Sequence, residues 1–316
     1  MKHGSLLVIK PGLLTTVQDL GRFGHQAAGV PVAGPMDSFS HRLANQLVAN
    51  DAAAATLEIT LIGPELECDV ETTFAIAGAH FDVWCGDRPV PMATSFRVSQ
   101  GQRVRFGKRI QGARAYLGVS GGVQARPILG SRATHVVSGM GGHDGRALVA
   151  GDRLPIASSL PPDTIRKAVG LTLPTGGRAT LRVIPGPQAE WFHADALRAV
   201  SGTSFRISSR SNRMGYRLEG PPLARIRPSE LISEPVCMGA IQVPGAGEPI
   251  LLMADRQTAG GYPKIGHVIS ADLPLAGQLA PGDFIEFLPC TMHEAVAALI
   301  ARERQLLRYS ALKDVS

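Results

Sequence analysis

The chain has 316 residues, 44% of them hydrophobic and 18% charged, with 36 glycines and 23 prolines, which is the composition of a folded, turn-rich protein and excludes a disordered one. The formal net charge of +6 favours anionic ligands. Aromatic residues make up only 5% of the chain and no basic run alternates with them, so we expect no nucleic acid as a partner.

The chain begins with a strand and a loop that lead into one helix. A strand is expected over residues 6–9, and a glycine-rich loop follows it. Asp37 is a suitable N-cap, and Phe39, Leu43 and Leu47 recur behind it at helical spacing. The pattern predicts a helix that packs one face on a sheet and turns Arg42 and Asn45 toward solvent.

Short β-like runs fill most of the remaining sequence. They cover residues 56–61, 65–69, 73–77, 80–84, 95–98, 103–106 and 114–119 in the first half, and 179–184, 204–207, 250–254 and 267–269 in the second. Turn residues separate the runs at the spacing typical of a β-barrel or sandwich. Helices are expected at about 188–200 and after Thr291, which matches a capping box with Glu294.

One stretch without periodicity, residues 157–177, contains Pro161 and Pro162 and predicts a domain boundary. We expect an N-terminal domain over residues 1–160 and a C-terminal domain over 178–290. A terminal helix is expected over 291–312.

The two halves repeat each other loosely and in the same order. The motif GRFG at 21–24 is echoed by NRMG at 212–215. We interpret the echo as a duplicated β-barrel unit. Two such units that face each other would bring the arginine of each motif, with Glu58 and Glu234, to a shared cleft, which is a common place for a ligand.

Polar side chains are densest between residues 249 and 274. A run with the length of a strand is followed by functional side chains of several types: Asp255, Arg256, Gln257, Thr258, Tyr262 and Lys264. Gly260 and Gly261 among them allow a backbone to approach a ligand. The alternative is a tight hairpin in which the Asp and Thr side chains bond only to the turn backbone.

Specific catalytic signatures are missing from the sequence. It contains no P-loop, GxSxG or HExxH motif and no GxGxxG motif after a strand. Ser120 at a glycine turn and His143 beside Asp144 are interpreted as loop residues, and no histidines pair at metal spacing, so no metal site is expected. The four cysteines lie far apart and predict neither a zinc site nor a disulfide framework.

The N-terminal apolar stretch is only about five residues long, too short for a signal peptide, and nothing approaches the ~18 apolar residues of a membrane span. We therefore expect a cytoplasmic protein without a membrane partner.

Several longer motifs act as a set. They are QDLGRFGHQAAGVPVAGPMD, SNRMGYRLEGP, SEPVCMGAIQVP and DRQTAGGYPKIGHVISADLP. With them, nearly the whole chain resembles the biotin-dependent carboxyltransferase family that includes allophanate hydrolase subunit 2 and the antagonist of the Kip kinase inhibitor. The resemblance implies a mainly β fold of two cyclophilin-like β-barrel domains with a few peripheral helices.

The resemblance also implies an activity. Stand-alone chains of this size in the family are commonly the C-type subunit of a bacterial 5-oxoprolinase, which works with two other subunits, of the A and B types, to open the lactam of 5-oxoproline to glutamate. The implied substrate is a small amide, and the implied cofactor is ATP in the complex, on this chain or on one of the other two. No lysine lies in an A-M-K-M context, so this chain is expected to carry no biotin.

Two alternatives stay open at this point. One is a carboxyltransferase component that acts on urea or a related amide with carboxybiotin. The other is a non-catalytic protein that binds and antagonises a kinase inhibitor.

The predicted site joins the polar stretch to the motif positions of the resemblance. Asp255 is expected to orient water or a proton, while Arg213 and Lys264 stabilise phosphate or oxyanion charge. The expected substrate-binding residues are Gln18, Asp19, Arg22, Glu58, Asn212, Glu234, Gln242, Gln257, Thr258, Gly260, Gly261 and Tyr262.

Overall fold

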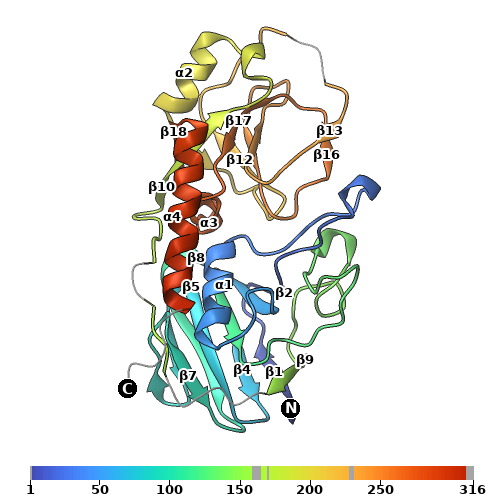
Figure 1. Ribbon diagram of the computed structural model, residues 1–316, viewed down its shortest axis with the longest axis vertical. Helices are drawn as coiled ribbons and strands as arrows, with labels where there is room; N and C mark the ends of the chain where they lie inside the picture. Colours follow the sequence, from blue (N-terminus) through green and yellow to red (C-terminus); the bar gives the residue numbers. More distant parts are fainter. Residues whose placement is uncertain (1, 159–164, 169–170, 228–230, 311–316) are drawn as a thin grey trace. The chain divides into compact units, whose positions relative to one another are not determined.

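The chain divides into two compact units in the computed structural model, which describes residues 2–158, 165–168, 171–227 and 231–310 (Figure 1). Unit 1 comprises residues 1–22, 33–173 and 304–316, and unit 2 comprises residues 23–32 and 174–303. The mainly β class expected from the sequence is confirmed. Pro161 and Pro162 of the expected boundary lie outside the described residues.

Unit 1 is built on a nine-stranded sheet with antiparallel pairings. Its strands are β1 (Lys2–Lys10), β2 (Leu14–Gln18), β3 (Thr56–Thr60), β4 (Glu65–Cys68), β5 (Thr72–Cys85), β6 (Arg88–Pro89), β7 (Ser95–Val98), β8 (Arg103–Val119) and β9 (Arg153–Ser158). The main order is β2-β3-β8-β4-β1-β9, and β5 pairs with β6, β7 and β8.

The two longest strands correct the sequence prediction. The runs expected at 73–77 and 80–84 form the single strand β5, and those at 103–106 and 114–119 belong to β8. Gly78 in β5 and Gly112 in β8 adopt positive φ values of 97° and 75°, and the β5–β8 register shifts after Gly78. A glycine inside a strand can mark a bulge instead of an end, and here it does.

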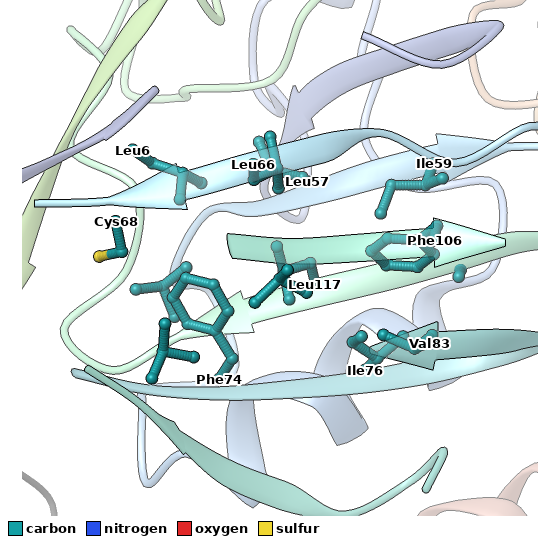
Figure 2. Packing of buried hydrophobic residues seen from close by; sticks show 14 of the residues in the cluster. Leu6, Leu57, Ile59, Leu66, Cys68, Phe74, Ile76, Val83, Phe106 and Leu117 are labelled. Carbon is teal, nitrogen blue, oxygen red and sulfur yellow. The ribbon is translucent and has the colours of Figure 1, made fainter. Parts of the chain in front are cut away.

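The core of unit 1 is an apolar cluster that contains side chains from β1, β3, β4, β5 and β8. Figure 2 shows Leu57 and Ile59 of β3 and Phe74 and Ile76 of β5 directed into it, with Leu117 of β8 among them. All five side chains are essentially inaccessible to solvent. Burial of this apolar surface is the main stabilising contribution of the sheet.

Helix α1 (Ser38–Leu47) packs on β5 and β8. The Asp37 side chain caps it by accepting a hydrogen bond from the Ser40 backbone N–H (2.9 Å). Phe39, Leu43 and Leu47 are buried, as their spacing predicts. Local sequence therefore determines both the helix and its N-cap.

Asn45 corrects one expectation for this helix. Its side chain is fully buried, not solvent-facing. Its Nδ2 donates to the Ala54 carbonyl (2.7 Å), and its Oδ1 accepts from Asn50 Nδ2 (3.1 Å). Helical periodicity does not show that the chain after the helix folds back over this position.

Unit 2 contains a closed seven-stranded barrel in the order β10-β17-β14-β15-β12-β11-β18. Its strands are β10 (Arg178–Pro185), β11 (Ser204–Ile207), β12 (Gly215–Glu219), β14 (Ala240–Gln242), β15 (Ile250–Leu252), β17 (Lys264–Val268) and β18 (Phe284–Pro289). β13 (Glu234–Pro235) and β16 (Ala259–Gly260) form a separate two-stranded sheet. The polar stretch between residues 249 and 274 thus runs from β15 through β16 to β17.

The remaining helices are short, apart from the last. They are η1 (Gln26–Ala28), η2 (Val136–Ser138), η3 (Ala189–Trp191), α2 (Ala194–Gly202), α3 (Leu273–Gly277) and α4 (Met292–Ser310). The helix expected at 188–200 is split into η3 and α2. The capping box of α4 is confirmed, because the Glu294 N–H donates to Thr291 Oγ1 (3.2 Å) and the Thr291 N–H donates to Glu294 Oε2 (2.7 Å). No described helix is long and apolar enough to cross a membrane.

Candidate functional site

A pocket of about 240 Å³ lies in unit 2 against the barrel wall. In that wall Gly215 pairs with Leu252, and Ile250 pairs with both Arg217 and Gln242. Because side chains alternate along a strand, these five residues share one face of β12, β14 and β15. Arg217 is exposed, so this face points away from the barrel interior.

A loop before β12 forms one side of the pocket and supplies Arg210, Asn212 and Met214. The Met214 backbone N–H donates to Asn212 Oδ1 (2.8 Å), which orients the amide. The Asn212 NH₂ group then has donors left for a ligand. Arg210 carries a cation near the pocket and makes a loose, exposed ion pair with Glu248 (3.6 Å).

Two further amides and a phenol line the pocket from β14 and the segment around β16: Gln242, Gln257 and Tyr262. Gln242 is buried, and its Oε1 accepts from Gln257 Nε2 (3.2 Å). Gln257 Oε1 makes no hydrogen bond to the described part of the chain and is therefore an acceptor that a ligand N–H can use.

A side chain at the position of Gly260 would collide with the pocket amides. A Cβ at this position would lie 2.8 Å from Gln242 Nε2 and 3.2 Å from Gln257 Nε2. The glycine therefore leaves room for both amides beside β16. The sequence predicts that these two glycines let the backbone approach a ligand, and this stays a prediction. The structure shows two amides of the chain itself close to Gly260.

The two expected catalytic residues Arg213 and Asp255 form a buried, two-point ion pair. Arg213 Nε donates to Asp255 Oδ2 and Arg213 Nη2 to Asp255 Oδ1, both at 2.9 Å. Their side chains are only 6% and 3% exposed. The Asp255 N–H also donates to the Arg213 carbonyl (2.9 Å), so the pair fastens the loop before β12 to the segment after β15.

Lys264, the third expected catalytic residue, lies buried in β17 and forms an ion pair with Glu234. Gln188 supports this pair, because its Nε2 donates to Glu234 Oε1 (2.9 Å) and its Oε1 accepts from the Lys264 N–H (3.1 Å). The hydrogen bond from Lys264 is the main cause that holds the pKa of the Glu234 carboxyl below its usual value.

Thr258 and Gly261 are not among the residues that line the pocket, but their backbone carbonyls anchor the segment next to it. The Thr258 carbonyl accepts from the Val236 N–H (3.1 Å), and the Gly261 carbonyl accepts from the Leu231 N–H (3.1 Å). These bonds hold the segment that carries Gln257 and Tyr262.

The expected substrate-binding residues of unit 1 make internal contacts. Asp19 accepts from the Gly21 N–H (3.0 Å) and from Ser131 Oγ (2.6 Å). Arg22 is fully buried and donates to the carbonyls of Ile128 (2.9 Å) and Ala133 (2.8 Å). Burial lowers the pKa of Arg22, and the nearby Asp19 carboxylate opposes that shift.

Gln18 and Glu58 also lie inside unit 1. Gln18 Nε2 donates to the Thr134 carbonyl (3.0 Å). Glu58 Oε2 accepts from the Met36 N–H (2.8 Å) and from the Tyr116 hydroxyl (2.7 Å). Burial, with Glu58 next in importance, raises the pKa of Tyr116. The cleft shared by the two units stays a prediction.

No group of three or more potential metal ligands occurs among the described residues. The pocket instead presents amide donors and acceptors with two arginines at its side. Such a set can bind a small polar molecule that carries an amide and a negative charge.

The model of the carboxyltransferase domain family, subdomains A and B, matches residues 28–289. This chain belongs to that family. The family's relatives include the C subunit of 5-oxoprolinase from Escherichia coli, 39% identical over 95% of this chain and 96% of that protein. The protein of the same name from Haemophilus influenzae is 35% identical over 89% of each chain.

Solved structures of the family agree with the fold. The Kluyveromyces lactis urea carboxylase superposes with a TM-score of 0.91 and 33% identity, over 99% of this chain and 30% of that one. The K. lactis urea amidolyase gives a TM-score of 0.91 and 33% identity, over 99% of this chain and 20% of the larger protein. The chain thus spans less than a third of either protein.

Sequence reasoning missed the two pocket arginines, Arg210 and Arg217. Arg210 follows Ser208 and Ser209 in a polar loop, and Arg217 sits between Tyr216 and Leu218, which are buried. The alternation of buried and exposed residues in β12 was a signal that Arg217 faces away from the barrel core. Only the strand pairing places it across Ile250 from Gln242, on the same face of the barrel wall.

Proposed function

We propose that this chain is the C-type subunit of an ATP-dependent 5-oxoprolinase that opens the lactam of 5-oxoproline to glutamate. The similarity to the C subunits of two 5-oxoprolinases extends over nearly their full lengths, which supports the assignment. The proposal includes two further subunits, of the A and B types, and a cytoplasmic complex.

The pocket in unit 2 carries the proposal. 5-Oxoproline has a lactam C=O, a lactam N–H and a carboxylate. Asn212 can donate to the C=O, Gln257 Oε1 can accept from the N–H, and Arg217 or Arg210 can pair with the carboxylate. The pocket chemistry therefore matches all three polar groups of this substrate.

The chemistry that we propose proceeds through an activated carbonyl. The lactam oxygen accepts the terminal phosphoryl group of ATP, which releases ADP. Water then adds to the carbon, and the ring C–N bond breaks as the nitrogen takes a proton, which leaves an acyl phosphate. A second water hydrolyses the acyl phosphate to glutamate and phosphate. In this scheme Asn212 and Gln257 hold the lactam in place, and the Arg213–Asp255 ion pair keeps Asn212 and Gln257 at the pocket.

The proposal places ATP on one of the other two chains of the complex. The amide pocket, about 240 Å³, is smaller than the ~300–1,000 Å³ typical of ligand sites, and a nucleotide in addition to the lactam would need more room. The absence of a P-loop sequence from this chain supports the same placement.

The decisive experiment mixes the purified chain with its A-type and B-type partners and measures glutamate release from 5-oxoproline with and without ATP. We expect release only in the full mixture with ATP. Gln257→Ala and Asn212→Ala should raise KM for 5-oxoproline about tenfold each, because each loses one hydrogen bond to the substrate. Gln124→Ala, an exposed amide of unit 1, is the matched control and should leave KM unchanged.

A carboxyltransferase is the second candidate, favoured by the family and by the match to urea carboxylase. The amide pocket also suits urea, which has the same C=O and N–H groups. Carboxylation of urea by this chain with a biotinylated partner, in a mixture that releases no glutamate, would select this candidate. Tight partner binding without either activity would instead select the kinase-inhibitor antagonist.

A further inference from the structure

A thiol and an imidazole meet in unit 2, outside the amide pocket. Cys237 begins a β-turn in which the Ala240 N–H donates to the Cys237 carbonyl (3.3 Å), and Gly239 supplies the φ of 91° that the third turn position needs. The Val268 N–H donates to the Gly239 carbonyl (2.8 Å), so the turn is fixed on β17. This backbone places Cys237 Sγ 3.3 Å from His267 Nδ1.

The imidazole lies within reach of the thiol proton. Burial is the main cause that lowers the pKa of His267, and the positive charge of Lys264 acts in the same direction. His267 is therefore neutral near pH 7, and its Nδ1 can act as an acceptor in one tautomer. Neighbouring thiol and imidazole groups are the usual pair for an activated cysteine.

Arg256 adds a cation to the pair. Its Nε donates to the Val236 carbonyl, next to Cys237 in the chain (3.4 Å). Burial lowers the pKa of Arg256, and the nearby Cys237 and Asp255 oppose that shift. A positive neighbour stabilises a thiolate.

Cys237 differs from the other cysteines of the chain. It is exposed, whereas Cys68 and Cys85 are buried and Cys290 is half-buried. Burial raises the pKa of those three thiols, which disfavours their reactive form. The chain thus contains its own internal controls for thiol reactivity.

An apolar groove of about 330 Å³ includes this pair. Ile184 and Ile269 contribute from the barrel side, and Met292, Val296 and Leu299 contribute from α4. Met292 and Val296 are 62% and 50% exposed, so a ligand in the groove can cover them. None of the groove residues lines the amide pocket.

We propose that Cys237 is a modification site that accepts an acyl group with an aliphatic chain from an acyl thioester. His267 takes the thiol proton, and Cys237 Sγ attacks the thioester carbonyl carbon. The new S–C bond forms as the C–S bond of the donor breaks, and the leaving thiolate takes the proton from His267. The aliphatic chain lies in the groove, where it covers the apolar side chains of α4.

This proposal does not rest on the proposed function. The thiol supplies the covalent attachment, and the groove beside it supplies chain selectivity. A charged acyl group would lose hydration in the groove, whereas a chain of methylenes is stabilised by each CH₂ that it buries there.

The test uses the full chain at pH 7 with the octanoyl and acetyl thioesters of N-acetylcysteamine, followed by intact mass and peptide mapping. We expect one octanoyl group on Cys237, a faster reaction with the octanoyl than with the acetyl donor, and no addition to Cys237→Ser. His267→Gln should slow both donors about tenfold or more, because the variant lacks the group that takes the thiol proton. Leu299→Gln should slow the octanoyl donor and leave the acetyl donor unchanged.

Three results would overturn the proposal. Acylation of Cys290 as fast as Cys237 would remove the role of the local environment. An unchanged rate in His267→Gln, with the variant folded by circular dichroism, would remove the base. Equal rates for the two donors in the unmodified chain would remove the groove as the acyl site.

Discussion

Arg213 and Asp255 are predicted as catalytic, but they bind each other next to the pocket and do not line it. The sequence predicts both as catalytic, and both lie in a buried ion pair whose neighbours in sequence, Asn212 and Gln257, line the pocket. The sequence points to the loops that carry the pocket residues Asn212 and Gln257. It does not contain the pairing distance that decides which of the polar residues there face a ligand and which face each other.

Removal of one partner of this ion pair should destabilise unit 2. Arg213→Ala or Asp255→Ala leaves a buried charge without its partner, and we expect a loss of about 3–5 kcal/mol in the free energy of unfolding. Denaturant titration measures the loss. The double variant should lose clearly less than the sum of the single losses, and strict additivity would contradict the coupling.

His41 makes a pH-dependent contribution to unit 1. It is fully buried on α1 beside Thr56 Oγ1 (2.9 Å), and burial lowers its pKa from 6.5 to about 4. The unfolded chain therefore binds a proton below pH 6.5 that the folded chain refuses until about pH 4. The stability is complete above pH 6.5 and falls as the pH drops through this window, by roughly 3 kcal/mol in total.

Unfolding titrations between pH 7 and 4 test the contribution. A His41→Gln variant should show a shallower loss of stability across this range than the unmodified chain. His193→Gln, at an exposed position, should keep the original slope. Identical slopes for all three proteins would contradict the assignment to His41.

At the scale of elements, the sequence predicts what local pattern encodes. The cap at Asp37, the stripe of α1, the capping box of α4 and the bounds of β7 and β11 all follow from neighbouring residues. The continuity of β5 and β8 does not follow from neighbouring residues, because a glycine in the sequence can mark either a turn or a bulge. Arg217 was missed for a related reason, since its place at the pocket depends on strand register.

Gly118 controls how closely α1 approaches β8. A Cβ there would lie 2.7 Å from the Ala44 carbonyl oxygen, a backbone atom that cannot rotate away. We expect Gly118→Ala to lower the free energy of unfolding by about 1–3 kcal/mol, because the helix must shift. Gly202→Ala, at a position with no heavy atom within 4 Å of the added Cβ, is the control and should change it by no more than ~0.5 kcal/mol.

Gly260 on β16 controls the amide pocket instead of stability. An added methyl group meets the flexible ends of Gln242 and Gln257, which can move. Gly260→Ala should therefore fold normally and raise KM for 5-oxoproline in the assembled enzyme, measured by glutamate release. An unchanged KM would separate these two amides from substrate binding.

At the scale of the molecule, the mainly β class was within reach of the sequence, because short β-like runs are spread along the whole chain. The duplicated barrel stays a prediction. The sequence did not predict how the chain passes between the two units. Residues 23–32 belong to unit 2 and residues 304–316 to unit 1, although the boundary expected from the sequence is one linker. Such exchanges depend on long-range packing, which leaves no local periodicity.

The end of α4 completes the core of unit 1. Leu306 is 1% exposed and joins Phe39, Leu43 and Tyr116 in one apolar cluster. Leu306→Ala should lower the free energy of unfolding of unit 1 by about 2–5 kcal/mol, measured by hydrogen exchange of α1 amides. Leu307→Ala, at a 62% exposed neighbour, should leave that exchange unchanged.

The position of Leu306 also has a consequence for biosynthesis. A ribosome releases the first 173 residues long before it reads the codon for this leucine, so the nascent unit 1 waits with an open apolar gap beside α1. A premature stop at codon 306 or shortly before it would therefore destabilise the part of the protein that was made first.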